Sequence, residues 1–181
     1  MKAGIGCSKV ELGKGVIVCA LSVVNALGNI VLPDGSILAG NRSSKDGEKY
    51  ETFKGLSEFL TDAKANTTIS VVGLNVDLGT RENYERVAHI AAQGQVRAIN
   101  PVNTSLDGDT VFVFSNEEIK SFLTPLGNQT ARPAWHNLGV DIVAQAAANA
   151  VRESIYDACK ESKTIKLDKA YKGIIPSCND Y

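Results

Sequence analysis

The longest apolar stretch of the chain, Val16–Val24, is the feature that most constrains its fold. Its nine residues are mostly β-branched and lack the 3.6-residue periodicity of a surface helix, so we expect a β-strand. Nine residues interrupted by Ser22 are also far too few to cross a membrane. The segment therefore predicts a strand of ordinary length in the core of a globular protein.

Length and charge narrow the class of protein further. A chain of 181 residues suits one domain, residues 1–181, and is short for two. The 19 Lys and Arg residues nearly cancel the 20 Asp and Glu residues, which gives no electrostatic reason to expect a nucleic acid or an anionic membrane as partner. No signal-peptide core follows the first residues, so we expect a soluble, cytoplasmic chain.

The chain offers no metal-ligand pattern. Its four cysteines lie far apart without a CxxC pair, and neither of its two histidines stands at ligand spacing from a cysteine. We therefore expect no metal site. The cysteines are expected to be small core residues of a reducing compartment, namely Cys7, Cys19, Cys159 and Cys178.

Turn residues and β-branched runs predict several more strands. The Asp34-Gly35 turn favours a hairpin between its two flanking apolar runs. The expected strands are Asn29–Pro33, Ser36–Ala39, Thr67–Leu78 and Thr110–Phe114. Residues 41–51 are polar and predict an exposed loop, and the tail from Lys163 is expected to be irregular.

The helices are expected mainly in the second half of the chain. Thr80 is expected to cap a helix that ends near Gln93, with Tyr84, Val87, Ala88 and Ala91 on its buried side. Ser115–Glu118 has the capping-box pattern and predicts a short helix to about Phe122. The longest helix is expected from Leu138 to about Cys159, and one turn from Leu56 to Leu60. Because strands precede helices without strict βαβ alternation, we expect an α+β fold.

The segment Asn66-Thr67-Thr68 carries the most chemistry. A hydroxyl residue that opens a buried strand after a loop asparagine is often only a strand entrance. The alternative is self-cleavage, in which the Thr67 hydroxyl attacks the carbonyl of Asn66 and leaves Thr67 as a new N-terminus. The freed α-amine, whose ordinary pKa is about 8, then serves as the base for its own hydroxyl.

Five ordered motifs resemble the L-aminopeptidase/D-esterase family of self-cleaving N-terminal-nucleophile peptidases. The family includes β-aminopeptidases and the 6-aminohexanoate-oligomer (nylon oligomer) endohydrolase. The similar segments are Lys2–Gly6, Val23–Gly28 with Ile37–Gly40, Thr67–Val72, Arg97–Asn103 followed by Asp107–Phe112, and Gly173–Pro176. The resemblance implies an αββα sandwich, here truncated at its N-terminus, and a compact homo-oligomer, a tetramer or larger.

The resemblance also implies roles for individual residues. Thr67 matches the nucleophile, and Asn66 matches the residue before the cleaved bond. Asn25 matches a side-chain amide that donates to the oxyanion, an interaction worth roughly 3 kcal/mol. Asp107 and Asp109 match polar residues that hold the α-ammonium of Thr67 or of the substrate. Lys2 matches a lysine near the active site; its alternative is a frayed chain end.

The chain departs from the family in length, because family members are roughly twice as long and carry over a hundred residues before the segment at Lys2. Three explanations stay open: a shortened gene product, one piece of a split protein with a separate N-terminal half, or an incomplete sequence. A sheet without its first strands would expose apolar surface.

The resemblance implies an autoprocessed threonine-nucleophile amide hydrolase, with no metal and no organic cofactor. Its substrate would be a short peptide or amide with a free amine, and cleavage would give residues 1–66 and 67–181. One alternative is a non-catalytic family member or subunit that needs a partner half. A weaker alternative is an acyltransferase with a threonine nucleophile.

Overall fold

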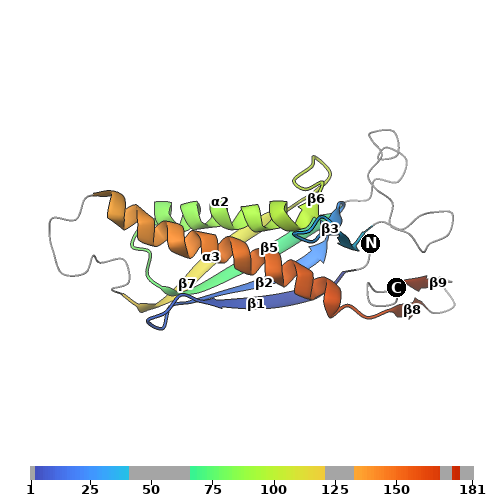
Figure 1. The fold of residues 1–181 in the computed structure, drawn as a ribbon, viewed down its shortest axis with the longest axis horizontal. Helices are drawn as coiled ribbons and strands as arrows, with labels where there is room; N and C mark the ends of the chain where they lie inside the picture. The colour runs from blue at the N-terminus through green and yellow to red at the C-terminus, as the bar shows by residue number, and fades with distance from the viewer. Residues whose placement is uncertain (1–2, 41–65, 121–132, 168–172, 176–181) are drawn as a thin grey trace.

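The structure is a computed structural model that describes residues 3–40, 66–120, 133–167 and 173–175. Its two described helices lie side by side across one face of a sheet (Figure 1). The elements in chain order are β1 (Ile5–Glu11), β2 (Ile17–Asn25), β3 (Asn29–Val31), β4 (Ile37–Ala39), β5 (Thr67–Val76), α2 (Arg81–Ala98), β6 (Ile99–Asn100), β7 (Thr110–Ile119), α3 (Pro133–Lys160), β8 (Ile165–Leu167) and β9 (Gly173–Ile175).

The main sheet has four strands in the order β1-β2-β5-β7. β1 and β5 both pair antiparallel with β2, whereas β5 and β7 are parallel and α2 forms the crossover between them. A small sheet of order β4-β3-β6 lies at one end, and β8 pairs with β9 in a separate hairpin. The expected α+β class is confirmed.

The inner face of the main sheet packs against α2 and α3 and holds the core. Strand residues alternate along β2 and β5, so that Val18, Ala20 and Val72 are buried on this face. The helices contribute Val87 and Val151, both fully buried. Alanines of the longest helix also lie inside, and Ala144, Ala146, Ala147, Ala148 and Ala150 are all buried.

Glycines allow the layers to approach closely at two points. A Cβ atom on Gly6 of β1 would lie 2.1 Å from the backbone nitrogen of Ala158, so α3 rests directly on this strand. A Cβ atom on Gly94 of α2 would lie 2.3 Å from the carbonyl oxygen of Ala148. Small side chains on both partners therefore set the distances between α3 and its two neighbours.

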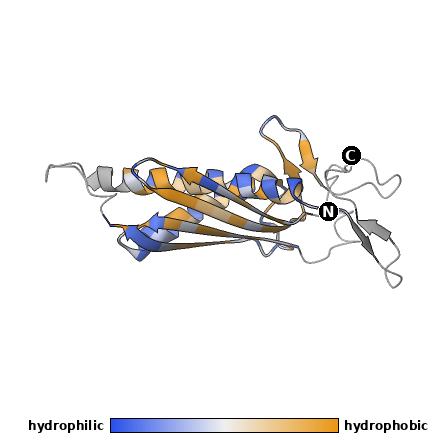
Figure 2. Cartoon of the chain, turned by 90° about the horizontal axis from the view of Figure 1, so that it is seen from below, coloured by the Kyte–Doolittle hydropathy of each residue, from blue (hydrophilic) through white to orange (hydrophobic). Residues whose placement is uncertain are grey.

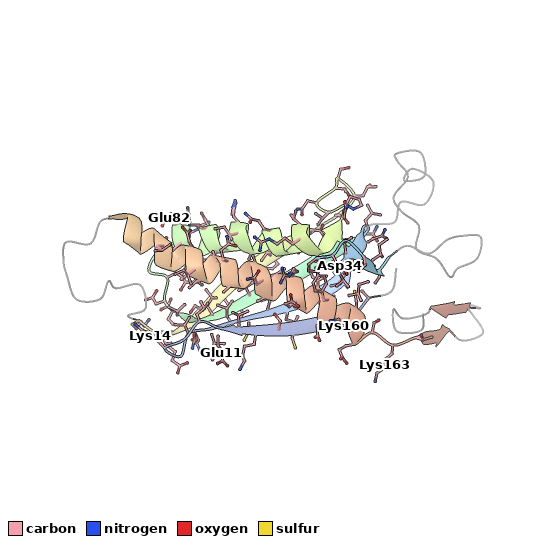
Figure 3. All side chains as sticks on the ribbon, in the orientation of Figure 1. Glu11, Lys14, Asp34, Glu82, Lys160 and Lys163 are labelled. Carbon is pink, nitrogen blue, oxygen red and sulfur yellow. The ribbon has the colours of Figure 1, made fainter. Side chains whose placement is uncertain are left out.

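The outer face of the main sheet is largely apolar, with Lys9 and Glu11 of β1 as charged exceptions, and carries no described element. Its exposed residues, which we call the outer apolar face, are Ile5, Leu21, Val23, Ile69, Phe112 and Phe114, with exposed fractions from 41% to 62%. Figure 2 shows the strands largely in the hydrophobic colour. The charged side chains labelled in Figure 3, such as Glu11, Lys14 and Glu82, lie at the ends and edges of the layers. When one face of a sheet packs on the core and the other is exposed to solvent, the exposed face is normally polar.

The main strands agree with the sequence-based expectations, including the hairpin of β3 and β4. Both long helices also form, but α2 runs to Ala98 instead of ending near Gln93, and Thr80 stands at its N-cap without a side-chain cap hydrogen bond. The helix predicted from Ser115 to about Phe122 is wrong over its described part, because β7 continues to Ile119. The Ser115 hydroxyl does not cap a helix; it donates to the carbonyl oxygen of Val76 on β5, 2.8 Å away. Pairing with β5 thus overrides a local capping signal.

Other expectations need correction or are untested. The sequence-based expectations did not include β1, and the tail expected to be irregular contains the β8–β9 hairpin. Of the cysteines, Cys159 is buried as expected, but Cys7 and Cys19 are exposed because they alternate onto the outer side of the sheet. The loop at residues 41–51 and the turn at Leu56–Leu60 lie outside the described residues.

The close contact at Gly94 generates a test of helix packing. By intrinsic propensity alone, Gly94→Ala would stabilise α2 by about 1 kcal/mol. Because the new methyl group would clash with Ala148 and Val151, we expect it to lower the free energy of unfolding by about 2 kcal/mol in urea titrations. Val96→Ala, at a residue 54% exposed on the same helix, should change that free energy by under about 0.5 kcal/mol. Stabilisation by Gly94→Ala would contradict this packing.

Candidate active site

The register between β2 and β5 brings two of the candidate residues together. Asn25, the last residue of β2, pairs with Thr67, the first residue of β5. Both side chains alternate onto the outer side of the sheet, where opposed Cβ atoms lie about 4.5–5.5 Å apart. The amide of Asn25 and the hydroxyl of Thr67 are therefore neighbours on one surface.

The peptide group between Asn66 and Thr67 is held by the loop that precedes β7. The backbone N–H of Gly108 donates to the carbonyl oxygen of Asn66 over 3.0 Å, and the Thr67 hydroxyl donates to the same oxygen. A Cβ atom at position 108 would lie 2.9 Å from the Thr67 hydroxyl oxygen. Glycine thus permits the loop to sit directly against both the carbonyl group and the hydroxyl.

Asp107 lies beside the same peptide, because Asn66 and Asp107 form an isolated parallel bridge. Its Oδ2 accepts hydrogen bonds from the Thr104 hydroxyl, at 2.6 Å, and from the Thr104 backbone N–H, at 3.3 Å. Its Oδ1 is buried and has no hydrogen-bond partner among the described residues. Buried polar atoms normally have a partner, so this oxygen can accept a further donor.

Asp109 has a different environment although it is only two residues away. Its Oδ1 accepts the backbone N–H of Thr68 at 2.6 Å, and its Oδ2 accepts that of Asn103 at 3.0 Å. Both oxygens are thus bonded to backbone groups, one on β5 and one in the loop. The two aspartates therefore differ: Asp109 ties the loop to β5, whereas Asp107 keeps one oxygen open.

The structure leaves other candidates outside this site. Lys2 lies outside the described residues. No cluster of three or more potential metal ligands occurs in the part of the chain that the structure describes. Among those same residues, no helix is long and apolar enough to span a membrane. An open surface hollow near the end of α2 is lined by Val96, Ile99 and Pro101 among others, but by none of the candidate residues.

The sequence analysis assigned no role to two residues of this region, Gly108 and Gln95. Gly108 lies between the two aspartates that the sequence singled out, and a glycine flanked by acidic residues is ordinarily a turn. Gln95 of α2 is 1% exposed and donates to the carbonyl oxygen of Thr68 at 3.1 Å. A glutamine within a helical pattern carries no sequence signal for such a contact.

Comparison with known proteins identifies the family. The model of peptidase family S58 matches residues 1–172. This chain belongs to peptidase family S58. The resemblance to L-aminopeptidase/D-esterase proteins drawn from the motifs is thereby confirmed.

The S58 chain is similar to proteins about twice its length. It is 29% identical over 185 residues to the uncharacterized aminopeptidase Rv1333 of Mycobacterium tuberculosis, covering 97% of this chain and 53% of that protein. It is 30% identical over 166 residues to the 6-aminohexanoate-oligomer endohydrolase of Paenarthrobacter ureafaciens, covering 88% and 44%. The chain thus spans about half the length of the curated relatives it matches.

A solved structure supports the fold of this S58 chain. The L-aminopeptidase D-Ala-esterase/amidase of Ochrobactrum anthropi, described as a variant of the Ntn hydrolase fold, superposes with a TM-score of 0.58. The match covers 97% of this chain and 45% of that protein at 17% identity. At this identity the likeness concerns the fold alone.

Proposed function

We propose that this chain is the nucleophile-bearing part of an autoprocessed amide hydrolase. In this proposal the chain is cut between Asn66 and Thr67, and Thr67 then forms an acyl-enzyme with short peptides or amides that have a free amine. The observation that carries the proposal is the carbonyl group of Asn66, which contacts both the Thr67 hydroxyl and the Gly108 N–H.

The proposed self-cleavage uses only groups of the chain and water. The Thr67 hydroxyl oxygen bonds to the carbonyl carbon of Asn66, and its proton passes to the departing amide nitrogen. The Gly108 N–H, 3.0 Å from the carbonyl oxygen, stabilises the negative charge that develops there. Water then hydrolyses the ester, which leaves a carboxylate on Asn66 and a free α-amine and hydroxyl on Thr67.

In turnover, the α-amine of Thr67 removes the proton of its own hydroxyl as that hydroxyl attacks the substrate carbonyl. Asn25, opposite Thr67, donates its side-chain amide to the oxyanion. Asp107 Oδ1, which has no partner among the described residues, accepts a hydrogen bond from the new α-ammonium group. Asp109 meanwhile fixes the backbone of Thr68. A role for Lys2 stays a prediction. Relatives of this chain include an uncharacterized aminopeptidase and an oligomer endohydrolase, and this supports amide substrates.

The cleavage step is tested by intact mass under denaturing conditions. We expect two species, residues 1–66 and 67–181, the second beginning at Thr67. Thr67→Ala should stay whole, because it lacks the attacking oxygen, and Thr67→Ser should still be cut. The matched control is Thr68→Val: it removes the neighbouring hydroxyl, which has no described partner, and should be cut normally. Cleavage of Thr67→Ala at the same bond would refute the assignment.

The oxyanion role of Asn25 is tested by the kinetics of the cleaved enzyme on aminoacyl amides. Asn25→Ala is expected to lower kcat by roughly 10²-fold, because a donor to the developing charge is lost. Asn25→Asp keeps the shape without the N–H donors and should fall by a similar factor. KM should change little in both variants. A loss of only a few-fold would remove Asn25 from the oxyanion site.

A second candidate function is that of a subunit that is inactive until another layer covers it. The observation that favours it is the outer apolar face, which extends from Thr67 and Asn25 along the sheet. We propose that a second apolar sheet covers this face, supplied by a polypeptide equivalent to the part of the relatives that lies outside the match. That polypeptide would be a separate N-terminal half or a further segment of the same protein. A covering sheet would also form one side of the substrate site.

Larger assembly is a separate proposal. We expect the covered unit to form a homo-oligomer, a tetramer or larger, as the family resemblance implies. A second copy of this chain on the outer apolar face would be a different arrangement, and the next experiment distinguishes the two.

Cysteine alkylation tests whether a second sheet covers the outer face. Cys7 and Cys19 are exposed on that side, whereas Cys159, near the end of α3, is buried. In the isolated chain, iodoacetamide should modify Cys7 and Cys19 within minutes and leave Cys159 unmodified, as read by mass spectrometry. In the protein purified from its own cells with any bound partner, Cys7 and Cys19 should be protected.

Sedimentation of the isolated chain completes this test. We expect a range of associated species, and Phe112→Lys should shift them toward monomer, because it places a charge on the outer apolar face. The matched control Val96→Lys, on an exposed position of α2, should leave association unchanged. A single dimer with protected Cys7 and Cys19 would instead assign the face to a second copy. A monomer with labelled cysteines in cells would refute any covering layer.

A further inference from the structure

The buried amide of Gln95 lies directly behind the strand end that carries Thr67. Gln95 is 1% exposed, and its Nε2 lies 3.1 Å from the carbonyl oxygen of Thr68 and 3.3 Å from the Ser70 hydroxyl oxygen. The carbonyl oxygen of Thr110 on β7 is 3.5 Å from the same nitrogen. One side chain of α2 therefore contacts both parallel strands where their pairing begins, at Ile69 and Thr110.

Gln95 and Asp109 hold the same residue through its two backbone hydrogen-bonding groups. Thr68 donates its N–H to Asp109 Oδ1 at 2.6 Å and accepts the Gln95 amide at its carbonyl oxygen. Both peptide groups that flank the Cα of Thr68 are thus fixed by side chains from other elements. Thr67 directly precedes Thr68, so these two hydrogen bonds limit the backbone conformations that Thr67, the first residue of β5, can adopt.

A polar network continues from Gln95 into the core. The Ser70 hydroxyl bonds to that of Ser22 at 2.8 Å, and Ser22 bonds to that of Ser154 on α3 at 2.7 Å. Ser154 also reaches the carbonyl oxygen of Val151 at 2.8 Å. All four side chains are buried. Burial of an amide and three hydroxyls costs stability unless each is bonded, so an apolar residue would serve ordinary packing at least as well.

We propose that Gln95 is a positioning residue for Thr67. It acts through the backbone of Thr68 and keeps the hydroxyl of Thr67 against the carbonyl of Asn66 and the side chain of Asn25. The proposal rests on the assignment of Thr67 as the nucleophile. Its role does not require Gln95 to touch the substrate, because Gln95 lies on the inner face and Thr67 on the outer one.

The test compares two variants of the same buried network. Gln95→Met keeps the length of the side chain and removes the donor at the strand end. Ser154→Ala, the matched control, removes a hydroxyl at the α3 end of the network, where the contact is with Ser22. Both are studied as the whole chain, at temperatures where denaturant titration shows each variant to be fully folded.

The first readout is the rate at which the fragment beginning at Thr67 appears. We expect Gln95→Met to slow cleavage at least about tenfold, since a misplacement of about 1 Å can cost a hundredfold. Ser154→Ala should cleave within about twofold of the unsubstituted chain. In the cleaved enzyme, kcat should fall with Gln95→Met while KM holds. Equal cleavage rates in both variants, with Thr67→Ala uncut, would overturn the role of Gln95 and leave the proposed function standing.

The second readout is amide hydrogen exchange of the segment from Thr67 to Val72, and it does not require activity. Gln95→Met should raise exchange at Thr68–Ser70, and Ser154→Ala should not. If the unsubstituted chain and all variants stay whole, the proposed function fails for this chain, and the exchange result alone decides whether Gln95 holds the strand end. Unchanged exchange in Gln95→Met would overturn the proposal.

Discussion

The candidate site depends on the register between β2 and β5. The two strands pair antiparallel so that Asn25 stands opposite Thr67 at the end of the ladder. Since side chains alternate along a strand, a shift by one residue would send Thr67 to the inner face and Thr68 to the outer one. Two buried hydrogen bonds on the inner face oppose such a shift, because both would be lost. They join Ser22 to Ser70 and Gln95 to the carbonyl oxygen of Thr68.

The two faces of β5 have different tasks, and this explains their contrasting composition. The inner face packs on α2 and α3 and carries polar groups that fix the backbone near Thr67. The outer face carries Thr67 itself, followed by apolar residues such as Ile69. The proposed nucleophile adjoins an apolar surface that no described element covers, and this fits a site that is completed by another layer. The half-length match to the relatives agrees with that arrangement.

The loop from Asn103 to Asp109 shows how three adjacent residues can differ in role. Asp109 bonds to two backbone amides, Gly108 offers its N–H to the carbonyl of Asn66, and Asp107 keeps an open buried oxygen. A substitution of Gly108 would press on Thr67, whereas the aspartates act through their carboxylates. The Asp-Gly-Asp motif therefore supports the site as a unit, although each residue contributes by a separate contact.

The sequence by itself determined the α+β class, the main strands, the two long helices and the motif around Thr67, because these depend on local patterns and ordered motifs. It also singled out Asn25, Asp107 and Asp109, but it treated the aspartates as an equivalent pair. Only the tertiary structure decided that both oxygens of Asp109 are bonded, whereas Asp107 Oδ1 has no partner among the described residues. It also decided that Gly108 and Gln95 belong to the region and that Ser115–Ile119 extends β7. The reason is that these features are hydrogen bonds between segments far apart in the chain, and such contacts outweigh local preference.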